Sequence, residues 1–181
     1  MSHLPIWQLG KINTELCDIA VKELMDILPQ GASMGSDGQY VNKEGRDTEL
    51  RFAAQGYWFS GLMYEFGIQA NKVNGWDYKI DDHENMQFGC YRENGHYDWH
   101  VDTFPLENRP VERKVSVVCL MNDPSEYTGG EFGIKLYQEY NPVFEKGSII
   151  AFPSMLEHKV YPVLSGTRMT SVIWMTGPQM R

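Results

Sequence analysis

The chain from Gly75 onward is divided into short segments that are rich in β-branched and aromatic residues. These segments are WDYKI, MQFGCYRE, YDWHVDTF, KVSVVCLMN, GEFGIKLY, GSIIAF, HKVYPV and TRMTSVIWM, and Gly, Pro, Asn and Asp residues lie between them. Such a succession is typical of β-strands that are joined by turns. About eight strands at this spacing predict a mainly β protein, built as a sandwich, a jelly roll or a small barrel.

The first 74 residues carry helical patterns instead. In residues 14–28 the apolar side chains recur every three or four positions, and Thr14 is placed to cap the start. Residues 48–70 carry a second apolar stripe, and the Gly- and Ser-rich stretch QGASMGSDGQ between the two patterns predicts a mobile loop. We therefore expect one domain over residues 1–181, in which a mainly helical region, 1–74, packs on one sheet of a β core formed by residues 75–181.

The composition restricts the class of protein and its partners. Of the 181 residues, 42% are hydrophobic and 22% are charged, which is typical of a globular protein. The formal net charge of -8 argues against binding to nucleic acid or to an anionic membrane, because both attract positive surfaces. No signal-peptide pattern opens the sequence and no apolar run has the length of a membrane span, so we expect a cytoplasmic protein. The three cysteines, Cys17, Cys90 and Cys119, are far apart in apolar contexts, which predicts buried thiols.

The segment YDWHVDTF places His100 and Asp102 two residues apart in an expected strand. Alternate side chains of a strand share a face, so the imidazole and the carboxylate would project from the same side. The pair is also consistent with a histidine that only hydrogen-bonds to a neighbouring aspartate. Together with His158, it forms the ligand set of non-haem Fe(II) oxygenases, which is two histidines and one carboxylate with open coordination positions. Zinc could use the same three ligands, although no H-E-x-x-H pair accompanies them.

Arg168 begins a segment in which Arg168, Thr170, Val172 and Trp174 share a face by their even spacing. An inward guanidinium is unfavourable unless an anion pairs with it, and it can grip a carboxylate through two parallel hydrogen bonds. A small dicarboxylate beside the metal would satisfy it. The alternative is an exposed arginine on an edge strand, with Trp174 in the core.

Three runs of the sequence resemble a known family: YRENGHYDWHVDTF, RKVSVVCLMNDPSEYTGGEFGI and GSIIAFPSMLEHKVYPVLSGTRMTSVIWM. They are similar to the Fe(II)- and 2-oxoglutarate-dependent dioxygenases of the prolyl 4-hydroxylase superfamily, in particular to the bacterial and phage PKHD-type hydroxylases. The resemblance covers residues 86–175 and implies a double-stranded β-helix, a jelly roll with the metal inside its open end. It implies hydroxylation of a C–H bond, in particular on a prolyl residue of a peptide or protein, with release of succinate and carbon dioxide. Fe(II), the co-substrates 2-oxoglutarate and O2, and ascorbate are the cofactors that it suggests.

The resemblance also assigns roles to individual residues. It implies that His100, Asp102 and His158 ligate iron and that Arg168 binds the distal carboxylate of 2-oxoglutarate. Tyr91, Thr170 and Trp174 then line the co-substrate site, and Tyr97, Trp99 and Arg113 are candidates for substrate contacts at its mouth. For Tyr91 and Tyr97, packing in the core is the alternative. Leu120 stands where the oxygen-sensing prolyl hydroxylases of animals have a tyrosine that helps to hold 2-oxoglutarate.

Two other classes of function stay open at this point. The protein could hydroxylate a free amino acid or a small metabolite, or it could be a metal-binding jelly roll without oxygen chemistry. The loops at residues 30–39 and 104–113 are candidates for closing over a substrate. Nothing in the sequence indicates an oligomeric state.

Overall fold

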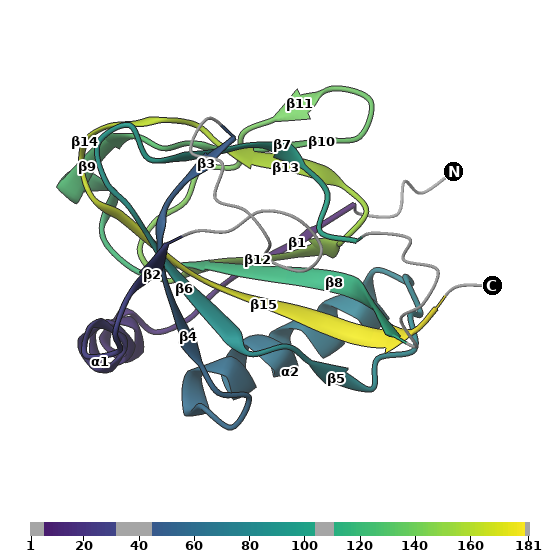
Figure 1. Ribbon diagram of the computed structural model, residues 1–181. Helices are drawn as coiled ribbons and strands as arrows, with labels where there is room; N and C mark the ends of the chain where they lie inside the picture. Colours follow the sequence, from purple (N-terminus) through teal and green to yellow (C-terminus); the bar gives the residue numbers. More distant parts are fainter. Residues whose placement is uncertain (1–5, 32–44, 104–110, 180–181) are drawn as a thin grey trace.

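The computed structural model describes residues 6–31, 45–103 and 111–179 (Figure 1). Its larger sheet has the strand order β1-β12-β8-β15-β6-β4-β2, and β5 also pairs with β15. The bounds are β1 (Gln8–Lys11), β2 (Gln30–Gly31), β4 (Glu49–Ala53), β5 (Asp82–His83), β6 (Met86–Tyr91), β8 (Val111–Leu120), β12 (Ser148–Pro153) and β15 (Arg168–Pro178). Each pair of neighbouring strands is antiparallel.

A smaller sheet lies over one face of the larger sheet (Figure 1). Its strand order is β11-β10-β13-β7-β3, and β14 and β9 form a separate pair. The bounds are β3 (Arg46–Asp47), β7 (His96–His100), β9 (Tyr127–Gly129), β10 (Phe132–Lys135), β11 (Glu139–Tyr140), β13 (Glu157–Val160) and β14 (Val163–Gly166), and a 3-10 turn, η1 (Pro124–Glu126), precedes β9. The helices α1 (Thr14–Met25) and α2 (Trp58–Val73) lie against the opposite face of the larger sheet (Figure 1). The predicted mainly β jelly roll with helices outside one sheet is confirmed.

Side-chain alternation gives the larger sheet two different faces. On β15, Ile173 and Met175 point toward the helices and pack with Phe59 and Met63 of α2. Val172 packs in a second cluster, between the sheets, which also contains Val118 and Phe152 of the larger sheet and Phe132 and Val160 of the smaller one. Because successive residues of a strand point to opposite faces, Arg168, Thr170 and Trp174 share the inter-sheet face with Val172. The functional site is built in this inter-sheet space.

The close approach of α2 to the larger sheet depends on Gly67. A Cβ atom at this position would lie 2.2 Å from Sδ of Met175 and 2.9 Å from a methyl group of Val117. We expect Gly67→Ala to lower the free energy of unfolding by about 1–3 kcal/mol, because the added methyl group overpacks this contact. Gly61→Ala is the matched control on the same helix, since nothing lies within 4 Å of its Cβ position. It should raise stability by about 0.5–1 kcal/mol through helix propensity, and denaturant titration of both variants tests the pair.

The N-terminal part differs from the sequence-based expectation. The predicted helix over residues 48–70 was wrong in its first part, because residues 49–53 form β4, which pairs with β6, and α2 begins only at Trp58. The strand β1, which was not predicted, pairs with β12 at the edge of the larger sheet. The predicted strand WDYKI is absent, since residues 76–80 form no ladder. The side chain of Asn71 instead binds the backbone N–H and C=O of Tyr78 at 3.0 and 2.9 Å.

Smaller corrections concern the cap of the first helix and two loops. α1 is capped by Asn13, whose side chain accepts a hydrogen bond from the N–H of Glu15 at 2.8 Å, and Thr14 is already the first helical residue. Most of the loop predicted at 30–39, namely 32–39, and residues 104–110 of the second candidate lid lie outside the described residues. In the parts of the chain that are described, no helix is both long and apolar enough to cross a membrane.

Candidate metal centre and co-substrate pocket

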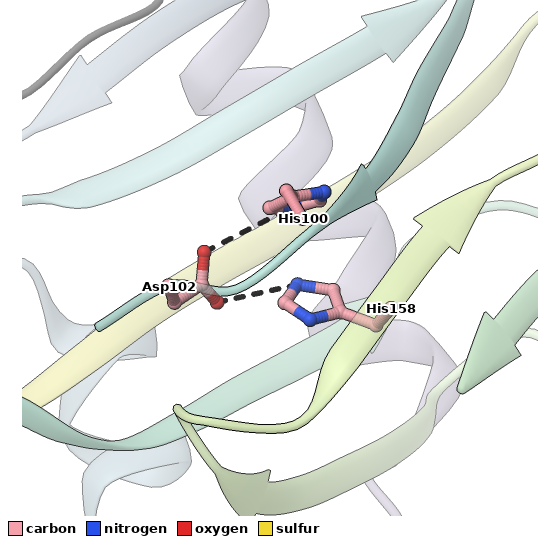
Figure 2. Close-up of side chains that lie close together, drawn as sticks. All are labelled: His100, Asp102 and His158. Carbon is pink, nitrogen blue, oxygen red and sulfur yellow. Dashed lines mark ion pairs between the residues drawn. The ribbon is translucent and has the colours of Figure 1, made fainter. Parts of the chain in front are cut away.

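His100, Asp102 and His158 converge between the two sheets (Figure 2). His100 is the last residue of β7, and His158 lies directly opposite it on the neighbouring antiparallel strand β13. Nε2 of His158 lies 3.3 Å from one carboxylate oxygen of Asp102, and Nε2 of His100 lies 3.7 Å from the other. The three possible ligand atoms all lie within 4.8 Å of one another. One divalent cation could therefore contact all three side chains.

Backbone carbonyl groups orient both imidazoles. Nδ1 of His100 lies 2.7 Å from the carbonyl oxygen of Asp98, and Nδ1 of His158 lies 2.9 Å from that of Leu156. Since a carbonyl oxygen only accepts, each Nδ1 carries a proton, and Nε2 of each ring faces the centre as the atom that could bind a metal. Burial and the neighbouring His158 lower the pKa of His100 to about 3. This imidazole is therefore neutral at physiological pH, which is the form that binds a metal.

Asp102 lies just beyond the end of β7, and not within the strand as the sequence predicted. The N–H groups of Asp102 and Thr103 both donate to the carbonyl oxygen of Ser154, at 2.9 and 3.1 Å. Ser116 of β8 donates its hydroxyl hydrogen to the Asp102 carboxylate at 2.6 Å. Burial alone would raise the pKa of Asp102, but the two histidines hold this pKa well below its usual value. The carboxylate is therefore ionised and fixed in place.

We expect Ser116→Ala to weaken Fe(II) binding by about tenfold or more, because partners that orient a ligand commonly contribute 10- to 100-fold to metal affinity. Ser116 is fully buried and also lies 2.9 Å from the hydroxyl group of Ser154. Ser171→Ala is the matched control, since Ser171 is a buried serine of the same sheet whose hydroxyl group has no hydrogen-bond partner among the described residues. Titration of the metal-free proteins with Fe(II) under anaerobic conditions compares them. Equal affinities would show that Ser116 does not position Asp102.

A pocket with about 400 Å³ of unfilled space opens beside the three ligands. It is lined by Arg46, Gln87, Tyr91, Tyr97, His100, Asp102, Val118, Phe132, His158, Val160, Arg168, Thr170, Val172 and Trp174. Three of these residues carry buried N–H groups that have no hydrogen-bond partner among the described residues, namely Arg46, Arg168 and Trp174. Free donors in a pocket that is otherwise largely apolar suit a ligand rich in acceptor oxygens.

Arg168 is the most deeply buried of these donors, with 1% of its surface exposed. Its guanidinium lies 5.6 Å from the ring centre of Tyr91, which stands opposite it on β6. Burial lowers the pKa of Arg168, although the guanidinium stays charged at any physiological pH. Among the described residues no carboxylate forms an ion pair with it. A buried cation of this kind is unfavourable unless a ligand supplies the anion, and a carboxylate fits the fork of its N–H groups.

Two imidazoles, a fixed carboxylate and a nearby guanidinium that has no ion-pair partner among the described residues fit an iron site with a dicarboxylate co-substrate. A sequence model of the 2OG-Fe(II) oxygenase superfamily matches residues 86–176, which contain all four of these side chains. The chain belongs to the 2OG-Fe(II) oxygenase superfamily. This membership agrees with the resemblance expected from the sequence, and it leaves the role of each residue to be tested.

The curated relatives of this chain include PKHD-type hydroxylases. One from Xylella fastidiosa is 36% identical over 97 residues, which cover 49% of this chain and 42% of that protein. One from Stutzerimonas stutzeri is 33% identical over 92 residues, covering 48% of this chain and 41% of that protein. The chain therefore spans about two fifths of the length of the curated relatives that it matches.

Solved structures share the fold of this protein over nearly the whole chain. A Pseudomonas putida prolyl-4-hydroxylase superposes with a TM-score of 0.75 at 19% identity, covering 94% of this chain and 92% of that one. A second structure is a prolyl hydroxylase of Trichoplax adhaerens in complex with a peptide fragment of the hypoxia inducible factor oxygen degradation domain. It superposes with a TM-score of 0.73 at 15% identity, covering 94% of this chain and 83% of that one. At these identities the likeness establishes the jelly-roll architecture.

The other candidate residues fall into two groups. Tyr91, Tyr97, Thr170 and Trp174 line the pocket beside the ligands. The ring of Tyr97 stacks on that of His100, with 3.5 Å between their centres. Leu120 is fully buried opposite Thr170 in the sheet register and is not among the lining residues.

Arg113 and Trp99 are not among the residues that line this pocket, and their contacts with a substrate stay predictions. Arg113 instead supports the wall, because its guanidinium lies 3.8 Å from the ring centre of Trp174 and binds both carboxylate oxygens of Glu84 at 2.7 and 2.6 Å. Trp99 packs under Lys135, whose Nζ lies 4.3 Å from its ring centre. His100 faces the pocket, so the adjacent Trp99 points away from it by strand alternation. The register shift between β7 and β13 lets Tyr97 share the pocket side with His100, although the two are three residues apart.

Arg46 and Gln87 line the pocket and were not predicted from the sequence. Gln87 lies on β6, whose side chains are buried on both faces. Arg46 lies in the two-residue strand β3, which pairs with β7 opposite Tyr97. A charged residue in a short polar stretch is normally solvated, so only the strand pairing reveals its position.

Proposed function

We propose that this protein is a 2-oxoglutarate-dependent dioxygenase that hydroxylates a C–H bond of a prolyl residue in a peptide or protein, with release of succinate and carbon dioxide. The observation that carries the proposal is the buried and unpaired Arg168 beside the His100, Asp102 and His158 cluster. A metal-binding module without oxygen chemistry has no need for a guanidinium that is left without an anion. A zinc hydrolase has no such need either.

Each group of residues has a distinct task in this proposal. His100, Asp102 and His158 hold Fe(II) from one side and leave its other positions to the co-substrates. The bound iron supplies the activation of O2 that is coupled to decarboxylation of 2-oxoglutarate. Arg168 grips the distal carboxylate and thereby sets the orientation of 2-oxoglutarate. The apolar lining residues Val118, Phe132, Val160 and Val172 exclude water from the pocket.

Two observations support a prolyl substrate. The pocket is lined in part by the aromatic side chain of Trp174, which suits the apolar ring of a proline. The Trichoplax adhaerens enzyme of the same fold is a prolyl hydroxylase in complex with a peptide. A free amino acid or small metabolite is the alternative substrate class. Stimulation by ascorbate and a cytoplasmic location stay predictions.

Succinate release in the presence of Fe(II) and 2-oxoglutarate tests the proposal. Proline-containing peptides should stimulate succinate formation, and the peptide should gain the mass of one oxygen atom. Stimulation by free amino acids alone would contradict the peptide substrate while leaving the oxygenase intact. An absence of succinate with every substrate, together with demonstrated iron binding, would favour the metal-binding module.

A further inference from the structure

The pocket contains a second buried guanidinium, on Arg46, that the chemistry proposed above does not use. Only 6% of Arg46 is exposed, and its Nε has no hydrogen-bond partner among the described residues. Its Cζ lies over the ring of Tyr97, 4.3 Å from the ring centre. The ring of Tyr97 also stacks on that of His100, with 3.5 Å between the ring centres. The side chains of Arg46, Tyr97 and His100 thus form a stack that leads from the pocket wall to the metal ligands.

No carboxylate of the described residues neutralises Arg46. Asp102 is the one acidic residue in the pocket lining, and it is engaged by Ser116 and the two histidines. Glu49, close to Arg46 in the chain, pairs with Arg51 and Arg92. Within residues 6–31, 45–103 and 111–179, no carboxylate is therefore left to balance the charge of Arg46.

The co-substrate cannot supply this missing charge. With iron and 2-oxoglutarate in place, the two positive charges of Fe(II) and the one of Arg168 are balanced by Asp102 and by the two carboxylates of 2-oxoglutarate. Arg46 then leaves one positive charge in a largely apolar pocket, where an uncompensated charge is strongly unfavourable. The unpartnered indole N–H of Trp174 in the same pocket is a further free donor for an acceptor oxygen.

We propose that Arg46 binds a carboxylate group of the substrate, so that the preferred substrate carries a negative charge close to the C–H bond that is hydroxylated. This inference rests on the proposed oxygenase function and narrows its substrate class. The carboxylate could belong to an acidic residue next to the proline of a peptide, or to the α-carboxylate of a free amino acid. Both present the same chemistry to the guanidinium.

Matched acid and amide ligands separate these sources. Three pairs serve as probes: Gly-Pro-Asp amide with Gly-Pro-Asn amide, Asp-Pro-Gly amide with Asn-Pro-Gly amide, and L-proline with L-prolinamide. Calorimetric titration uses the full chain loaded with Mn(II) and 2-oxoglutarate, which binds without turnover. In the wild type, the acid of at least one pair should bind about tenfold or more tightly than its amide, as expected for hydrogen bonds to charged groups. The pair that responds identifies the source of the carboxylate.

Two variants at this position complete the test. Arg46→Gln should remove the difference between acid and amide, and Arg46→Lys should keep part of it, while both bind 2-oxoglutarate within about twofold of the wild type. Equal binding of acid and amide in all three pairs, or an undiminished difference in Arg46→Gln, would overturn the inference and show that Arg46 only packs on Tyr97. A wild-type protein that fails to bind 2-oxoglutarate would instead overturn the proposed function, and with it this inference.

Discussion

Replacement of Asp102 by alanine should abolish succinate formation and weaken Fe(II) binding by more than about a hundredfold. Asp102 is the only anionic ligand of the cluster, and it lies within 3.7 Å of Nε2 of both histidines. Its loss leaves only the two imidazoles, which supply no negative charge and hold a divalent cation poorly. Loss of a ligand should exceed the 10- to 100-fold effects that are typical of residues behind the ligands. Anaerobic Fe(II) titration and a succinate assay measure the two effects.

Asp98→Ala is the matched control for this variant. Asp98 lies four residues earlier, on β7, with an exposed side chain, and its backbone carbonyl oxygen accepts a hydrogen bond from His100. The same change of charge at this position should leave iron affinity and turnover within about twofold of the wild type. Succinate formation by Asp102→Ala at the wild-type rate would refute the assignment of the metal site.

Replacement of Arg168 by methionine should weaken 2-oxoglutarate binding by about two orders of magnitude, with Fe(II) affinity unchanged. Truncating one partner of a buried, hydrogen-bonded charge pair commonly costs about 2–5 kcal/mol, which corresponds to a factor of roughly 30 to several thousand. Arg168→Lys keeps the charge but loses the second parallel hydrogen bond, so its affinity for 2-oxoglutarate should lie between those of the wild type and Arg168→Met. Titration of the iron-loaded variants with 2-oxoglutarate measures the loss.

Arg168→Met should weaken 2-oxoglutarate binding but should not destabilise the ligand-free protein. In the ligand-free protein, Arg168 is buried without an ion-pair partner among the described residues. A methionine of similar length removes this uncompensated charge. The free energy of unfolding of Arg168→Met should therefore equal that of the wild type or exceed it by up to about 4 kcal/mol. Thermal unfolding without ligands measures this. A large loss of stability together with unchanged 2-oxoglutarate affinity would show that Arg168 is a structural residue.

The strands of the β core were predictable because their residues match the local requirements of a sheet. Segments such as KVSVVCLMN and TRMTSVIWM became β8 and β15, in which β-branched residues alternate between the helix-facing core and the inter-sheet core. WDYKI also alternates apolar and polar residues, yet it packs its Trp76, Tyr78 and Ile80 against the helix-facing core and forms no ladder with the described strands. The apolar residues predict burial both for the segments of β8 and β15 and for WDYKI. Whether a segment forms a β-ladder depends on whether another strand lies beside it.

The misassigned start of the second helix has a similar cause. Leu50 and Ala53 are three residues apart, which suits a helix, but they also become buried in the strand β4. The pairing of β4 with β6 decides between the two, and it involves residues about 40 positions apart in the chain. Local periodicity carries no information about such a partner.

Sequence spacing likewise predicts some residues of the candidate site, whereas others are brought there only by strand pairing. His100 and Asp102 lie two residues apart, and the spacing of Arg168, Thr170 and Trp174 follows one strand, so each set was visible in the sequence. Ser116 and Arg46 reach the site only through the pairing of their strands with distant neighbours. Residues that support or extend a site are therefore the ones that sequence patterns miss.

The most direct test of the site is an anaerobic titration of the Fe(II)-loaded wild-type protein with 2-oxoglutarate. A keto acid that binds iron through its carboxylate and keto oxygens gives a visible charge-transfer band. We predict that this band appears and saturates at one equivalent of 2-oxoglutarate. Iron binding without any band, even at saturating 2-oxoglutarate, would contradict the assignment of His100, Asp102, His158 and Arg168 as an oxygenase site.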